Sequence, residues 1–240
     1  MKRAIVIGAS SGIGKQVAQM LIDEGWTVGL AARRDGMLMA MMHAHEDRVK
    51  VEKIDVTASS ATESLTHLIK RIGGMDLFFY AAGIGKQNPE LDETIELSTA
   101  RTNGVGFMRM IGEAFRYFAA KGEGHIVAIT SIAGTKGLGP APAYSATKAM
   151  QSTYLQALEQ LAFQRGLKIS FTDIRPGFVD TDLLSGTHKY PMLMKPEPVA
   201  KAIMQAIKSK KHICVIDTRW SLLTMLWRRI PRWLWRRMKL

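Results

Sequence analysis

The segment YSATK places Tyr144 and Lys148 four residues apart, and Ser131 of AITSIAG lies thirteen residues before the tyrosine. Residues spaced by four are neighbours on one face of a helix. Tyrosine has an ordinary pKa of about 10, and a nearby ammonium favours the phenolate. Such a pair could exchange a proton with a carbonyl oxygen while a serine hydroxyl hydrogen-bonds that oxygen. The alternative is an exposed pair on a solvated helix, and the surrounding elements decide between the two.

Length and composition predict one intracellular domain. The chain has 240 residues, of which 47% are hydrophobic, enough for one substantial core. Its single cysteine, Cys214, excludes an internal disulfide and suits a reducing compartment. The apolar run Ala4–Ile7 is too short for a signal peptide, and no stretch approaches the roughly 20 apolar residues of a membrane span. We therefore expect a cytoplasmic protein, with peripheral membrane contact left open by its C-terminal segment.

The arrangement of apolar runs predicts an α/β fold. Seven apolar, strand-like segments occur at 3–8, 27–32, 49–56, 75–83, 124–131, 168–177 and 212–217. Helical patterns occur between them at 12–25, 59–72, 98–120, 143–165 and 197–208, and a Met-rich helical segment follows the second strand. Buried strands alternating with helices predict a parallel sheet covered by helices on both faces.

A glycine-rich loop, GASSGIG, joins the first strand to the first helix. Gly8, Gly12 and Gly14 permit a tight turn and the close approach of a diphosphate to the backbone. The start of the helix offers unpaired N–H groups to phosphates. The loop is not of the ATPase type, because Gln16 stands where a magnesium-binding Ser or Thr would be required.

Taken together, five ordered motifs resemble the short-chain dehydrogenase/reductase family, in its compact single-domain form. The motifs are GASSGIG, YAAG at 80–83, Asn103 in TNGVG, Ser131 ahead of YSATK, and RPGFVDT at 175–181. The resemblance runs from about residue 3 to residue 217. It implies a doubly wound, Rossmann-type, seven-stranded sheet, a nicotinamide cofactor and a homo-oligomer, either a dimer or a tetramer.

The resemblance also implies a role for each matching residue. Tyr144 would be the acid or base, Lys148 would tune it and hold the ribose, Ser131 would bind the substrate oxygen, and Asn103 would position a water. The implied cofactor-binding residues are Gly8, Ser10, Ser11, Gly12, Ile13, Gly14, Ala82, Gly83, Tyr144, Lys148, Pro176, Gly177, Val179 and Thr181.

The end of the second strand indicates which nicotinamide cofactor is preferred. NAD enzymes of this family carry an acidic residue there, whereas this chain has Ala32 followed by Arg33 and Arg34. Arginine suits the 2′-phosphate of NADP(H), so NADP(H) is predicted. The alternative is two solvated arginines. Asp55 and Val56 would meet the adenine, as the family pattern implies.

The sequence does not name a substrate beyond a carbonyl or a secondary alcohol. Ile132, Ala133, Pro142 and Phe178, with the loop at about 182–196, would shape its pocket. The six histidines show no metal-ligand spacing, so no metal is expected. We predict an NADP(H)-dependent oxidoreductase. The alternative is a catalytically silent sensor or scaffold, which would be expected to lack Ser131, Tyr144 or Lys148.

The net charge of +12 is concentrated in a C-terminal extension. Residues 219–240 contain seven basic side chains and no acidic one, and without them 26 basic residues face 21 acidic ones. We therefore divide the chain into a cofactor-binding and catalytic domain, 1–218, and a basic amphipathic helical extension, 219–240. Pro231 is expected to split this extension into two helices. It could cover the pocket or join subunits, which we favour, or lie on an anionic membrane; we expect no nucleic acid.

Overall fold

The sheet has the predicted parallel arrangement. The computed structural model describes residues 2–34, 36–184 and 190–238. Within them the strands are β1 (Arg3–Ile7), β2 (Thr27–Ala32), β3 (Val49–Lys53), β4 (Leu77–Tyr80), β5 (Glu123–Ile129), β6 (Lys168–Arg175) and β7 (Ile213–Val215). They form one sheet in the order β3-β2-β1-β4-β5-β6-β7, with every pair parallel. The order reverses between β1 and β4, where ligands bind in such sheets.

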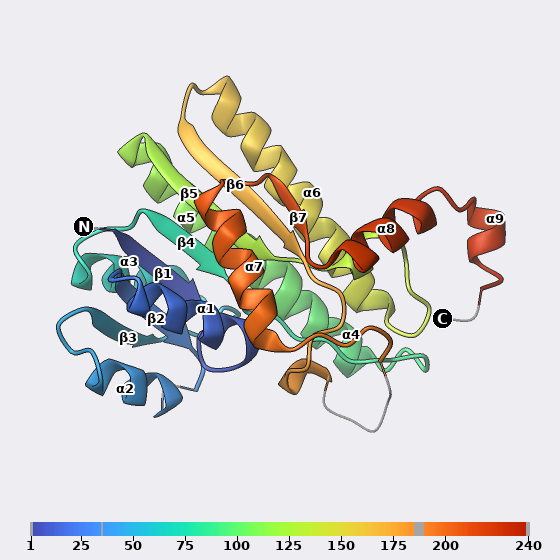
Figure 1. Ribbon diagram of the computed structural model, residues 1–240, viewed down its shortest axis with the longest axis horizontal. Helices are drawn as coiled ribbons and strands as arrows, with labels where there is room; N and C mark the ends of the chain where they lie inside the picture. Colours follow the sequence, from blue (N-terminus) through green and yellow to red (C-terminus); the bar gives the residue numbers. More distant parts are fainter. Residues whose placement is uncertain (1, 35, 185–189, 239–240) are drawn as a thin grey trace.

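Helices cover both faces of the sheet (Figure 1). They are α1 (Gly12–Asp23), α2 (Gly36–His43), α3 (Ala61–Arg71), α4 (Glu93–Thr99), α5 (Phe107–Lys121), α6 (Pro142–Gln164), α7 (Pro196–Lys208), α8 (Thr218–Trp227) and α9 (Arg232–Trp235). Alternate residues of β1 supply the two cores: Val6 packs in the cluster containing α1 and α7 residues, and Ile5 in the cluster containing α3, α5 and α6 residues. Both side chains are fully buried. The predicted doubly wound fold is therefore confirmed.

One predicted helix begins earlier than its apolar pattern indicated. The helix expected at 98–120 starts at Glu93, because Asp92 caps it by accepting hydrogen bonds from the amides of Thr94 and Ile95. Between α4 and α5 the chain passes through a π-helical segment, 100–106. Such wide turns often occur at functional sites, and this one contains Asn103.

The C-terminal extension forms two helices, as Pro231 predicted, and this residue precedes the first turn of α9. Figure 1 shows α8 and α9 projecting from one side of the body. The boundary at residue 218 stays an interpretation, and Lys239 lies outside the described residues. In the part of the chain that the structure describes, no helix is long and apolar enough to cross a membrane.

Candidate active site

Loops from several strands meet at the carboxyl edge of the sheet. A Cβ at Gly8 would lie 2.7 Å from the backbone nitrogen of Ala82, after β4. A Cβ at Gly12 would lie 3.1 Å from the Cγ2 atom of Thr181, after β6. The structure thus brings together the glycine loop, the YAAG segment and the segment Pro176–Thr181, all of which were predicted to hold the cofactor.

The glycine loop has the shape required to approach a diphosphate. Gly8 and Gly12 have φ angles of +85° and +53°, a region that residues with a Cβ rarely adopt. At Gly14 a Cβ would lie 2.1 Å from the carbonyl oxygen of Gly8, so no larger residue fits. Ser11 precedes α1 in extended conformation, and its side chain makes no capping hydrogen bond. The amides that open α1 therefore have no side-chain cap and are suited to a phosphate.

Lys148 is a buried cation in the second turn of α6. Its side chain is 4% exposed, and its Nζ atom donates a 3.0 Å hydrogen bond to the carbonyl oxygen of Ile129. Burial lowers the pKa of this ammonium to about 8, although the carboxylate of Asp173 opposes the change. A Cβ at Gly83 would lie 3.7 Å from Nζ, so the amine borders the predicted cofactor site.

Tyr144 and Ser131 lie beside this amine. The Nζ atom of Lys148 is 5.8 Å from the centre of the Tyr144 ring. Burial raises the pKa of Tyr144, and a hydrogen bond with the side chain of Ser131 opposes that rise. The ring also packs against the backbone of the loop after β4, because a Cβ at Gly85 would lie 2.8 Å from its Cε2 atom. The three residues proposed for the chemistry are therefore neighbours, and Tyr144 is not the fully exposed residue of a solvated pair.

Asn103 holds the loop after β4 in position. Its side chain accepts a 2.9 Å hydrogen bond from the amide of Ile84 and donates a 2.7 Å bond to the carbonyl of the same residue. Its own carbonyl oxygen accepts a 2.8 Å bond from the buried side chain of Gln151. The water-positioning role implied by the resemblance stays a prediction, and Gln151 is a neighbour that the sequence reasoning did not identify.

The residues predicted to determine the preference for NADP(H) lie at the same carboxyl edge of the sheet. Arg33 and Arg34 are exposed directly after β2, whereas Ala32 is buried. Asp55 is exposed nearby; hydrogen bonds from Thr57 lower the pKa of its carboxyl, and the charge of Arg33 does so to a smaller extent.

Val56 differs from its neighbour Asp55, because its side chain is buried toward Gly106. The carbonyl oxygen of Val56 accepts a 2.9 Å hydrogen bond from the side chain of Arg109, and the contact of Asp55 and Val56 with adenine stays a prediction.

The predicted substrate wall includes residues from the C-terminal extension. Phe178 packs edge-on against Trp220 of α8, with ring centres 5.5 Å apart, and lies 4.8 Å from the ring of Tyr190. Trp220 is 2% exposed, and it presses on Gly177, where a Cβ would lie 2.3 Å from the indole nitrogen. Trp220 and Tyr190 were not predicted as wall residues. The concentration of tryptophans in the extension was the only signal for Trp220.

The other predicted wall residues differ in exposure. Ile132 and Ala133, which follow Ser131 in the chain, are buried, whereas Pro142 opens α6 and lines a shallow hollow together with residues 134–139. Residues 185–189 of the loop expected at 182–196 lie outside the described residues.

A buried carboxylate lies near the Lys148 amine. Asp173 of β6 is 5% exposed, pairs with Arg175 at 2.6 Å and accepts a 2.5 Å hydrogen bond from Thr130. Its charge stabilises the Lys148 ammonium. The sequence reasoning missed this residue, although an acidic side chain inside a predicted buried strand was a usable signal. Within the described ranges, no three His, Cys, Asp or Glu residues are grouped to hold a metal.

Comparisons with known proteins agree with this geometry. The profile of the family described as short chain dehydrogenase matches residues 2–190. An uncharacterised oxidoreductase of Staphylococcus aureus (strain USA300) is 31% identical over 219 residues, covering 89% of this chain and 94% of the relative. The chain belongs to the short-chain dehydrogenase family and is an oxidoreductase of that family.

Two solved structures resemble the fold. A short-chain dehydrogenase from Streptomyces avermitilis has a TM-score of 0.82 at 23% identity, and the match covers 93% of this chain and 91% of the other. ElxO, solved with NADP bound, has a TM-score of 0.81 at 23% identity, and the match covers 92% of this chain and 99% of the other.

Proposed function

We propose that the protein transfers a hydride between NADP(H) and a carbonyl or secondary alcohol, with Tyr144 as the general acid or base. The observation that carries the proposal is the grouping of the Tyr144 phenol with the buried Lys148 amine and the Ser131 side chain. Side chains on a solvated helix surface would not be buried against one another in this way. A scaffold protein would not need to bury an ammonium, which is unfavourable unless it is paired.

Each residue has a step that its chemistry supports. The nicotinamide supplies or accepts the hydride when the cofactor is bound. In the reduction, the Tyr144 hydroxyl donates its proton to the carbonyl oxygen as the carbonyl carbon gains the hydride, which yields the alcohol. Ser131 donates a hydrogen bond to the same oxygen while negative charge develops there. Lys148, with its positive charge, lowers the free energy of the Tyr144 phenolate left behind.

The preference for NADP(H) rests on the residues after β2. Arg33 and Arg34 are exposed at the edge that carries the glycine loop. An acidic residue at the end of β2 would repel a 2′-phosphate, and this chain has the apolar Ala32 there instead. The structurally similar ElxO was solved with NADP bound, which supports the same choice. A small carbonyl or alcohol is the expected partner, and the homo-oligomer implied by the family remains part of the proposal.

The test has two stages. A panel of carbonyl compounds and secondary alcohols, followed by NADPH absorbance, identifies a competent substrate. We then expect Tyr144→Phe to lose at least about a hundredfold in turnover, because the proton donor is gone, while binding of NADPH is retained. Tyr154→Phe is the matched control, since it removes a phenol from the same helix that points toward Phe107 instead. Near-normal turnover by Tyr144→Phe would contradict the assignment.

A further inference from the structure

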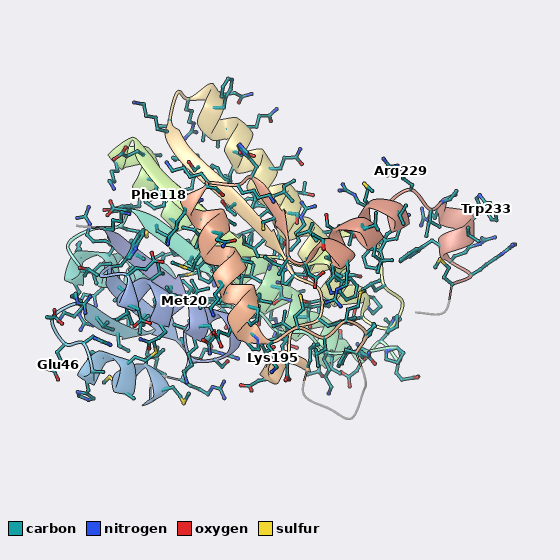
Figure 2. The ribbon with its side chains drawn as sticks, in the orientation of Figure 1. Met20, Glu46, Phe118, Lys195, Arg229 and Trp233 are labelled. Atoms are coloured by element: carbon teal, nitrogen blue, oxygen red, sulfur yellow. The ribbon has the colours of Figure 1, made fainter. Side chains whose placement is uncertain are left out.

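The helices α8 and α9 present a large apolar surface to solvent. On α8 the exposed residues are Leu222, Leu223, Met225 and Leu226, with exposed fractions from 37% to 57%. Trp233, Leu234 and Met238, on and just after α9, are exposed as well, with exposed fractions from 41% to 58%. Soluble proteins seldom expose so many adjoining large apolar side chains without a binding role. Figure 2 shows Trp233 at the outer end of the projection, away from the body.

The opposite side of the same segment is anchored to the body. Trp220 and Thr224, on the inner side of α8, are buried. The indole of Trp227 donates a 2.6 Å hydrogen bond to the side chain of Thr135, and that of Trp235 donates a 2.8 Å bond to the carbonyl of Gly137. Because the inner side is fixed by these contacts, the outer side is a defined surface.

The segment is also strongly and uniformly basic. Residues 218–238 contain six arginines and no acidic residue. Arg219 pairs with Asp217 at 2.6 Å. Among the described residues, no carboxylate forms an ion pair with the other five, which are Arg228, Arg229, Arg232, Arg236 and Arg237. All five are exposed, and Arg229 lies on the outer side of the projection (Figure 2).

Apolar and cationic residues on one surface restrict what can bind it. A two-fold contact with a second copy would set the same patch against itself, so the arginines of the two copies would repel one another. A nucleic acid would neutralise the arginines but would leave the leucines and Trp233 in water. A bilayer with anionic lipids satisfies both, because apolar side chains enter the interface while arginines reach the lipid phosphates. Tryptophan is also enriched at this depth.

We propose that α8 and α9 dock the protein on an anionic membrane surface, with Leu222, Leu226 and Trp233 entering the interface. Leu222, Met225 and Leu226 lie on one stripe of α8. Arg229 follows the end of this helix, and its side chain donates a 3.2 Å hydrogen bond to the carbonyl oxygen of Met225, so its charge lies beside the apolar contacts. The protein lies on the bilayer without crossing it. This proposal does not depend on turnover, and the family match, which ends at residue 190, does not extend to the segment.

Sedimentation of the full-length protein with vesicles tests the proposal. The two vesicle types are phosphatidylcholine alone and phosphatidylcholine with about one third phosphatidylglycerol. We expect binding only to the anionic vesicles, and release as salt rises from about 50 to 500 mM. Each basic residue near such a surface strengthens binding about fivefold, so Arg228→Gln with Arg229→Gln should weaken it about thirtyfold.

Two further variants separate the apolar contribution from the charge. Leu222→Ser with Leu226→Ser keeps every charge and should also release the protein. Arg165→Gln with Lys168→Gln is the matched control, because it removes two exposed charges far from α8 and should bind as the parent does. Circular dichroism and NADPH binding verify that each variant is folded.

Several results would overturn the proposal. Equal binding to both vesicle types would show that anionic lipid is not recognised. Failure to bind either type would exclude docking. A change of oligomer size on a sizing column, with no vesicle binding, would assign the surface to a second copy. Retention on DNA, without binding to vesicles, would assign it to nucleic acid.

Discussion

Replacing Lys148 by methionine should move the pH dependence of the reaction without removing Tyr144. The Lys148 nitrogen lies 5.8 Å from the centre of the tyrosine ring. At that separation and an effective dielectric constant of about 20, the attraction between ammonium and phenolate is about 3 kcal/mol, or about two pKa units. Since the tyrosine is partly exposed, we expect water to reduce the shift to about one to two units.

The assay is the pH profile of alcohol oxidation at saturating NADP+, because oxidation requires Tyr144 without its proton. Without the ammonium the phenolate is less stable, so the pKa of Tyr144 should be higher in the variant. The pH at which the oxidation rate increases should therefore shift by the same one to two units toward alkaline pH. Lys148→Arg is the control, since it keeps a positive charge at every accessible pH. Fluorescence titration of NADPH separates this effect from weaker cofactor binding. A Lys148→Met profile that loses amplitude but keeps its position would refute the electrostatic role.

The same variant has a second, opposite consequence for the ligand-free protein. Folding lowers the pKa of Lys148 from 10.5 to about 8, so between these pH values the unfolded chain binds more protons than the folded one. The lysine therefore destabilises the fold most below pH 8, and stability rises as pH increases through this window. Below pH 8, Lys148→Met should raise the free energy of unfolding by at most about 3 kcal/mol. The gain is reduced by whatever the hydrogen bond from Lys148 to Ile129 contributed, because the variant loses that bond. Urea titrations at pH 7 and pH 10 measure this, and a stabilisation that is equal at both would contradict it.

Two further substitutions test how the site is positioned and which cofactor it prefers. Arg33→Ala should weaken NADPH about tenfold or more while leaving NADH nearly unchanged, because a charge-assisted hydrogen bond to phosphate contributes about 1.5–3 kcal/mol; equal losses in fluorescence titrations would show that Arg33 does not bind the phosphate. Gly85→Ala should lower kcat at least about tenfold with little change in cofactor affinity, because the new methyl group would lie 2.8 Å from the Tyr144 ring and displace it. Gly139→Ala, where a Cβ meets open space, is the control and should behave as the parent does.

The sequence predicted the strands and their parallel arrangement because both faces of the sheet are buried. The central strands β1, β2 and β4 are apolar at almost every position, a pattern that an exposed face would have interrupted. The seven apolar segments predicted the number of strands, and the resemblance implied the same number. The grouping of Ser131, Tyr144 and Lys148 followed from the resemblance alone.

The parts that the sequence did not predict depend on contacts between distant segments. Gln151 contacts the backbone of Asn103, 48 positions earlier, and Trp220 packs on Gly177, 43 positions earlier. Neither contact has a periodic pattern that would announce it. The same limit applies to the extension, whose amphipathic pattern could not show that the indole of Trp227 is bonded to Thr135 while Leu226 is exposed.

The residues that oppose stability lie where the chemistry is proposed. Lys148 is a cation at 4% exposure, and Gly8, Gly12 and Gly14 are flexible residues that cost conformational entropy on folding. A chain selected only for stability would place an apolar residue at 148, because burying a cation is unfavourable unless it is fully paired. Its presence there, with Asp173 supplying the opposing charge, is the arrangement expected when an ammonium of lowered pKa serves a reaction.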